Sequence, residues 1–178
     1  EAEPSFAQTD AVRSAIGYGH FFTPLQISRY ATTLATKGTL FKYTLIDKIT
    51  DKDGKVIRSL SPVVENNITE LSNKAWNKIT TGMENVILKN SSTLRKAYAN
   101  IPVTVAGKTG TAQVEGKADH SLFVVFAPYE NPEIAISVVL ENGASGAAAG
   151  GIVKDMLDAY FFSGYNNKAD TVPFTVLE

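Results

Sequence analysis

The sequence predicts an α/β domain of the α+β type, in which helices cover an antiparallel sheet. Two long runs of helical periodicity lie in the first ninety residues, whereas three strand-like segments follow residue 102. The last two of these segments are apolar on both faces, which is typical of a sheet covered on each side. At 178 residues the chain has the length of one domain with a single core.

The first predicted helix begins after Thr23. The run Thr23-Pro24-Leu25-Gln26 has the form of a capping box, and proline at the first helical position loses no hydrogen bond. Gly38 is placed to end the helix. One helical face carries the apolar residues Ile27, Tyr30, Ala31, Leu34 and Ala35.

A β-hairpin is predicted over residues 43–60. Its two runs, 43–49 and 55–60, flank Asp51-Lys52-Asp53-Gly54, in which Gly54 can take the positive φ that the turn needs.

Two further helices are predicted in the middle of the chain. Ser72 caps the first, and a short one follows Ser91-Ser92-Thr93 and must end before Pro102. The first should present one apolar side, made of Trp76, Ile79, Met83, Val86 and Ile87.

Three strands are predicted over 103–113, 121–127 and 133–141, with 128–132 as the turn of a hairpin. In the middle strand, Leu122, Val124 and Phe126 should face one way and Phe123, Val125 and Ala127 the other.

A small-residue loop over 143–151 should let a last helix sit close against the sheet. The residues of that helix expected to face inward are Ile152, Val153, Met156, Leu157, Tyr160 and Phe161. We assign residues 1–165 to the domain and 166–178 to a polar tail.

Composition excludes several classes of protein. Seventeen basic and 18 acidic residues give a net charge of −1, which argues against a nucleic-acid-binding protein. The absence of cysteine excludes disulfides, thiolate zinc sites and a cysteine nucleophile. No stretch reaches the roughly 18 apolar residues of a membrane span. His20 and His120 lie in no metal-ligand spacing, so surface or loop roles are favoured and no metal is predicted.

Two glycine-containing segments resemble nucleotide-binding loops but do not fit them. Gly107-Lys108-Thr109 would need a glycine where Pro102 stands, and it lies in a strand pattern. The loop 143–151 has no lysine and no dinucleotide-binding register, so close helix packing is its favoured role.

The chemistry-bearing segment is Lys108-Thr109-Gly110-Thr111. In an undistorted strand Lys108 and Gly110 share one face, and Thr109 and Thr111 share the other. Gly110 weakens a strand interior and indicates close approach of a ligand or another backbone. An ammonium, two hydroxyls and backbone N–H groups together make a receptor for a carboxylate or an oxyanion.

Here the sequence resembles the class B penicillin-binding proteins, the serine acyltransferases that cross-link peptidoglycan, whose third signature is Lys-Thr-Gly. The resemblance rests on the segments 15–19, 23–26, 107–113 and 123–128 and covers residues 10–162. Tyr18 stands where that family usually has glutamine. The resemblance implies a partial penicillin-binding transpeptidase or β-lactamase-like fold.

The other two family signatures are missing. No serine is followed by lysine three positions on or by asparagine two positions on. We therefore expect the nucleophilic serine to lie upstream in a parent protein, and this chain to be the C-terminal part of the transpeptidase domain, inactive alone.

By resemblance, Lys108 and Thr111 are the catalytic residues of this chain. Lys108 helps hold the charge and proton network, and the Thr111 N–H is half of the oxyanion hole. The Thr109 and Thr111 hydroxyls bind the carboxylate of a terminal D-alanine or of a β-lactam, with Gly110 and Gln113 also in the substrate-binding set.

The resemblance further implies a D-Ala-D-Ala stem peptide as substrate, β-lactams as inhibitors, no metal or organic cofactor, and the extracytoplasmic face of the cell membrane. A related β-lactamase or carboxypeptidase, or a non-catalytic β-lactam sensor, remains an alternative. The segment Ile134–Leu140 is expected to form an unpaired edge that pairs with the N-terminal part of the domain or with another copy.

Overall fold

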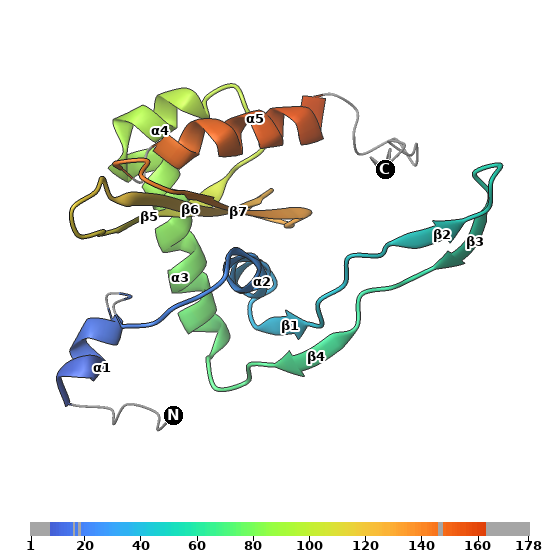
Figure 1. Cartoon of the computed structure of the whole chain (residues 1–178), viewed down its shortest axis with the longest axis horizontal. Helices are drawn as coiled ribbons and strands as arrows, with labels where there is room; N and C mark the ends of the chain where they lie inside the picture. Colours follow the sequence, from blue (N-terminus) through green and yellow to red (C-terminus); the bar gives the residue numbers. More distant parts are fainter. Residues whose placement is uncertain (1–7, 16, 18, 146–147, 163–178) are drawn as a thin grey trace.

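The computed structural model describes residues 8–15, 17, 19–145 and 148–162. Their largest sheet has three antiparallel strands in the order β5 (Ala106–Ala112), β6 (His120–Ala127) and β7 (Ile134–Leu140). Both faces of the sheet are covered by helices (Figure 1). The predicted fold class is therefore confirmed, whereas the predicted tail, 166–178, lies outside the described residues.

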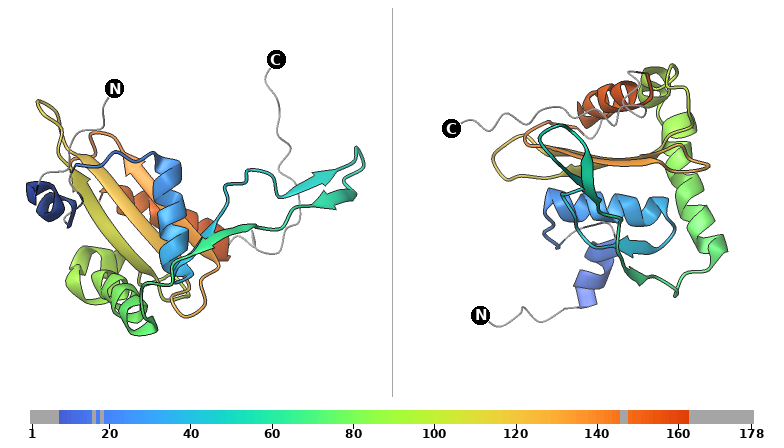
Figure 2. Two further views of the ribbon diagram at one scale, coloured as in Figure 1. Left: turned by 90° about the horizontal axis from the view of Figure 1, so that it is seen from below. Right: turned by 90° about the vertical axis from the view of Figure 1, so that its right-hand side faces the viewer.

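Helices lie on opposite sides of this sheet. Helix α5 (Ala148–Phe162) and the short α4 (Ser92–Ala97) cover one face, and α2 (Pro24–Ala35) covers the other (Figure 2). Helix α3 (Asn73–Asn85) stands beside β5 and connects the two sides through the π-helical turn η1 (Val86–Asn90). None of the helices in the described ranges is long and apolar enough to cross a membrane.

The core is divided by the sheet into two clusters. Alternate residues of β6 enter opposite clusters, as the sequence predicts. On the α5 side the buried residues include Phe123, Val125, Ala127, Val153 and Leu157. On the α2 side they include Phe126, Ala106, Leu34, Trp76 and Met83.

Helix α2 begins with the predicted capping box. The Thr23 backbone N–H donates to Gln26 Oε1 at 2.8 Å, and the Gln26 N–H donates to Thr23 Oγ1 at 3.2 Å. After the helix, Gly38 has a φ of 113° and donates its N–H to Thr33 O. Tyr30 is 58% exposed, so it is not part of the face that packs on the sheet.

The predicted hairpin is present but shorter, with β2 (Lys48–Thr50) paired to β3 (Val56–Ser59). Its turn contains Gly54 at a φ of 82°. An additional pair, β1 (Thr39–Phe41) with β4 (Val64–Asn67), joins it to α2 and α3 and was not predicted. We call residues 42–63 the arm, because this ribbon extends away from the rest of the molecule (Figure 1).

Helix α3 is capped as predicted, since Ser72 Oγ accepts from the Ala75 N–H at 3.2 Å. Its buried face differs by one position from the prediction: Ile79 is 38% exposed and Thr80 is 2% exposed. Thr80 can be buried because its hydroxyl donates to the Trp76 carbonyl of the preceding turn. The short α4 is present, but it begins at Ser92, with Ser91 as its cap, and not after Thr93. Helix α1 (Gln8–Ala15) was not predicted.

The last helix was only partly predicted. Val153 and Leu157 are fully buried, but Ile152 and Met156 are 42% and 45% exposed, so their predicted inward orientation is wrong. Buried positions recur every four residues, and Ile152 and Met156 lie one residue away from that stripe. Strand β5 also begins at Ala106 rather than at residue 103.

Candidate functional site

The predicted site lies on β5, which pairs with β6 in an unbroken register from Ala106 opposite Phe126 to Ala112 opposite His120. The other edge of β5 has no strand partner in the described part of the chain. Backbone N–H and C=O groups along such an edge can bind an extended ligand.

The two faces of β5 carry different chemistry. Lys108 lies opposite Val124 and Gly110 opposite Leu122, on the α2 side of the sheet. Thr109 lies opposite Phe123, on the α5 side. With no bulge in this pair, Thr111 shares the face of Thr109, so the undistorted pleat expected from the sequence is present.

The side chains at the C-terminal half of β5 are accessible. Lys108 and Thr111 are exposed, and Thr109 and Gly110 are half-buried. Lys108 Nζ donates to the Thr109 carbonyl at 2.6 Å, which keeps the ammonium close to the strand that carries it. Gln113 is exposed and lies one residue beyond the end of β5. The five predicted site residues thus follow one another along β5 and just beyond its end, with Lys108 and Gly110 on the opposite face from Thr109 and Thr111.

Gly107 is a residue of this segment whose role the sequence did not reveal. A Cβ at that position would lie 2.6 Å from Val125 Cγ1 and 3.0 Å from the Val124 carbonyl oxygen. Glycine is therefore required for β5 and β6 to pack at their observed separation. Gly110 is tight as well, at 3.3 Å from Leu122 Cβ. This contact is with a side-chain atom of the neighbouring strand, so the predicted approach of a ligand or another backbone at Gly110 stays a prediction.

The first residues of α5 pack against β6 on the α5 side of the sheet. Ser121 is fully buried, and its Oγ accepts from the Ala149 N–H at 3.1 Å. Tyr98 donates its hydroxyl to the Gly150 carbonyl at 2.7 Å. A Cβ on Gly150 would lie 3.1 Å from Leu94 Cδ2 of α4 and 4.0 Å from Phe123 Cε1 of β6, so glycine lets α5 lie close to α4, and the Ala149–Ser121 hydrogen bond joins the helix to the sheet.

The acidity of Tyr98 is changed by its position at this junction. Burial raises the pKa of the Tyr98 phenol above its ordinary value, and the nearby Asp155 carboxylate adds to this effect. The phenol is therefore kept neutral, as a donor to Gly150 must be.

Both histidines lie in loops or at strand ends. His120 Nδ1 accepts from the Asn142 N–H at 3.0 Å, and His20 Nε2 lies 3.0 Å from Ser14 Oγ. These contacts give each ring a structural partner. Among the residues that the structure describes, no three His, Cys, Asp or Glu side chains are grouped so that they could hold a metal ion.

Sequence comparison identifies the class to which this fold and strand belong. The family model described as the penicillin binding protein transpeptidase domain matches residues 3–158. The chain therefore belongs to that family, as the resemblance predicted.

Several curated relatives of this chain are named as peptidoglycan D,D-transpeptidases. The peptidoglycan D,D-transpeptidase MrdA of Escherichia coli (strain K12) is 33% identical over 176 residues. The match includes 90% of this chain but 27% of that protein. The chain thus spans about a quarter of the length of this curated relative.

Solved structures agree with this assignment. PBP2 of Pseudomonas aeruginosa, in complex with WCK 5153, is 34% identical with a TM-score of 0.72, covering 89% of this chain and 35% of that one. Penicillin-binding protein A of M. tuberculosis, as an imipenem acyl-enzyme complex, is 28% identical with a TM-score of 0.70, covering 83% and 33%. Both support the predicted fold.

Proposed function

We propose that the protein containing this chain is a serine-type peptidoglycan D,D-transpeptidase, and that the chain supplies its Lys-Thr-Gly strand. The observation that carries this proposal is the edge strand β5, on which an ammonium and two hydroxyls lie within four residues and whose outer edge pairs with no other described strand. Membership of the transpeptidase domain family supports it.

In the proposed reaction a serine from the rest of the domain attacks the carbonyl of the D-Ala-D-Ala peptide bond. The serine O–C bond forms, the peptide C–N bond breaks, and the terminal D-alanine leaves with the serine proton. An amine of a neighbouring stem peptide then attacks the ester, which returns the proton to serine. β-Lactams would acylate the same serine, but no part of the β-lactam would leave as a separate molecule.

Each site residue has a part in this reaction. Lys108 provides the positive charge that holds the proton network, and Thr109 and Thr111 donate hydroxyl hydrogen bonds to the substrate carboxylate. The Thr111 N–H donates to the developing oxyanion, and loss of one such donor typically slows a reaction by about 10²–10³-fold. Gly110 and Gln113 line the part of the site that binds the acyl donor, next to Thr109 and Thr111.

The proposal is tested in the whole parent protein by the rate of acylation with a labelled penicillin. We expect Lys108→Ala to lower that rate about 100-fold, because the charged group acts in the transition state. Thr111→Val should lower it about tenfold, because one hydrogen bond to a charged group is lost. Lys117→Ala, an exposed lysine beyond the strand, is the control. Wild-type rates in both site variants would contradict the proposal.

Turnover separates this function from the alternatives. A transpeptidase transfers the acyl group to an amine acceptor, a β-lactamase or carboxypeptidase transfers it to water, and a sensor retains it.

We further propose that the chain alone is inactive, because none of its serines has the Ser-x-x-Lys context. Intact mass after incubation with penicillin should show no adduct.

The outer edge of β7 is proposed to pair with a strand from the remaining part of the same domain. Within the described residues β7 pairs only with β6, and its Ile134 and Val138 are partly exposed. Such an edge is a template for another strand. Light scattering of the isolated chain should therefore show self-association that rises with concentration, and a monomer at every concentration would contradict this pairing.

A peptidoglycan substrate also implies a location for the protein. We propose that it acts outside the cytoplasmic membrane.

A further inference from the structure

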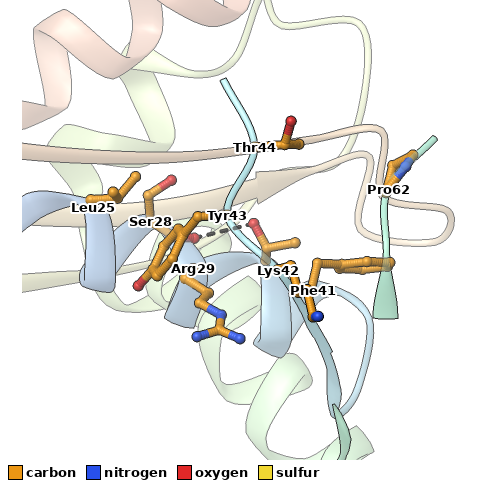
Figure 3. Close-up of a pocket in the computed structure, with 9 residues that line it drawn as sticks. Leu25, Ser28, Arg29, Phe41, Lys42, Tyr43, Thr44 and Pro62 are labelled. Atoms are coloured by element: carbon orange, nitrogen blue, oxygen red, sulfur yellow. Dashed lines mark hydrogen bonds between the residues drawn. The ribbon is translucent and has the colours of Figure 1, made fainter. Parts of the chain in front are cut away.

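A cavity lies between α2, β1 and the first residues of the arm, on the side of α2 that faces away from the sheet. Its volume is about 330 Å³. Leu25 of α2 and Tyr43 lie on one side of it, and Phe41 and Pro62 on the other (Figure 3). Volumes near 300 Å³ are at the lower end of the range for small-molecule pockets, so these walls fit one branched aliphatic group or one ring.

A guanidinium forms part of the same wall. Arg29 projects from α2, and its side chain is 20% exposed. Its Nη2 forms an ion pair with Glu65, and its Cζ lies 4.7 Å above the centre of the Tyr43 ring. Arg29 Nε is buried without a hydrogen-bond partner. Arginine has five N–H donors, and Glu65 is the one ion-pair partner of Arg29 among the described residues, so this group is short of acceptors.

A second cation stands at the rim of the cavity. Lys42 follows β1, and its backbone is held in place because its N–H donates to the Val63 carbonyl at 2.8 Å. Its side chain is exposed and forms no ion pair with any other described residue. Lys42 and Arg29 together carry two positive charges against the single negative charge of Glu65. The rim therefore attracts an anion, while the walls favour an apolar body.

We propose that this cavity binds a small amphipathic carboxylate, with its apolar body against Leu25, Phe41 and Tyr43 and its carboxylate between Lys42 and Arg29. This assignment does not depend on the proposed transpeptidase function. The same ligand chemistry occurs at the C-terminus of a peptide and in a short fatty acid, and the two sources are distinguished by choice of probe.

Calorimetric titration of the full chain tests the proposal with three probes of similar size. N-acetylleucine and hexanoate carry the carboxylate on a peptide-like and a fatty-acid-like body, and N-acetylleucinamide lacks the charge. We expect one of the carboxylates to bind saturably, at least tenfold more tightly than the amide and more weakly at high salt. Tighter binding of N-acetylleucine would support a peptide terminus, and tighter binding of hexanoate a fatty acid. Absence of binding by both, or equal binding of the amide, would overturn the site.

Variants localise the binding. Lys42→Gln should weaken it at least fivefold by removing the rim charge, and Ser28→Leu should abolish it by filling the cavity that Ser28 lines. Lys55→Gln removes another exposed lysine, near the tip of the arm, and should leave binding unchanged. Circular dichroism of each variant checks that the fold is kept. Unchanged binding in Lys42→Gln, or equal weakening in Lys55→Gln, would overturn the proposal.

Discussion

The sheet and the arm are both antiparallel β-structure, but they are stabilised by different interactions. In the sheet, Phe123 and Val125 of β6 have no exposed surface and contact helices beyond the strand. In the arm, all four residues of β3 are exposed, and Leu45 is 93% and Ile57 66% exposed. The arm therefore gains little from burial of its apolar side chains.

Backbone hydrogen bonds and the turn hold the arm together instead. The Asp51 carboxylate accepts from the N–H groups of Asp53 and Lys55 at 3.0 and 2.9 Å, and the Leu60 N–H donates to Asp47 O at 2.8 Å. A two-stranded hairpin is only marginally stable in water by itself. Similar strand pairing therefore gives very different resistance to mutation in the two regions, because packing supplies most of the stability.

Truncation of one apolar residue in each region gives the largest expected contrast. Phe123→Ala should lower the free energy of unfolding by about 3–5 kcal/mol, because it opens a cavity between β6 and α5. Ile57→Ala in the arm should change it by less than about 0.5 kcal/mol. Urea unfolding of both variants measures the difference. Equal losses would mean that the arm packs against something in solution.

Glycine substitutions test backbone packing against backbone conformation. Gly107→Ala should cost about 2 kcal/mol, because its Cβ would contact Val125 and the Val124 backbone at 3.0 Å or less. Gly54→Ala should cost about 1 kcal/mol, since its φ of 82° is unfavourable for alanine although nothing lies within 4 Å. Thermal unfolding midpoints compare the two. A Gly107→Ala chain as stable as the wild type would show that β5 and β6 can move apart.

Removal of one hydroxyl tests the junction between α5 and the sheet. Tyr98→Phe should cost about 1 kcal/mol at neutral pH, because the hydrogen bond to Gly150 is lost.

The effect of this substitution should depend on pH. Since the pKa of Tyr98 is raised in the folded chain, the unfolded chain loses this proton first as the pH rises above about 10. Stability from Tyr98 is thus complete below that pH and falls above it. Denaturant titrations at pH 8 and pH 11 should show a smaller alkaline loss in Tyr98→Phe, and equal losses in both proteins would contradict this linkage.

The smallest global effect is expected at the tip of the arm. Asp51→Ala removes the acceptor of two turn hydrogen bonds, so amide exchange at Lys55 should quicken about tenfold. The free energy of global unfolding should not change measurably. Amide exchange followed residue by residue separates these outcomes, and faster exchange in β6 would show that the arm and the sheet open together.

The parts of the fold that were predictable are those encoded by neighbouring residues. The capping box at Thr23 and Gln26 is completed within four residues, and the alternation in β6 follows directly from its sequence. Strands β1 and β4 were not predictable in the same way, since each has only three or four residues and they pair across the whole arm. The inward position of Thr80 instead of Ile79 depends on a hydroxyl bond inside α3 that no apolar pattern records.

The candidate site likewise has residues that the sequence predicted and residues that only the fold revealed. Lys108, Thr109 and Thr111 were identified because their chemistry is contained in one short segment. The supporting contacts of Ser121 and Tyr98 join residues 28 and 52 positions apart, so they became visible only with the fold. A serine within the apolar run of β6 was the one local signal for the first of them. Gly107 needed the position of the neighbouring strand to explain it.

The exposure of the arm affects where proteases cut the chain and where insertions are tolerated. Residues 42–47 have no regular secondary structure, and Leu45 projects almost wholly into solvent. A protease needs a segment of backbone that can be drawn into its cleft, and exposed loop segments are where nicking and tolerated insertions concentrate. The peptide bonds beside Leu45 are therefore the first expected cleavage points under limited digestion. The sheet would remain paired after that cut, since β5, β6 and β7 follow it in the chain.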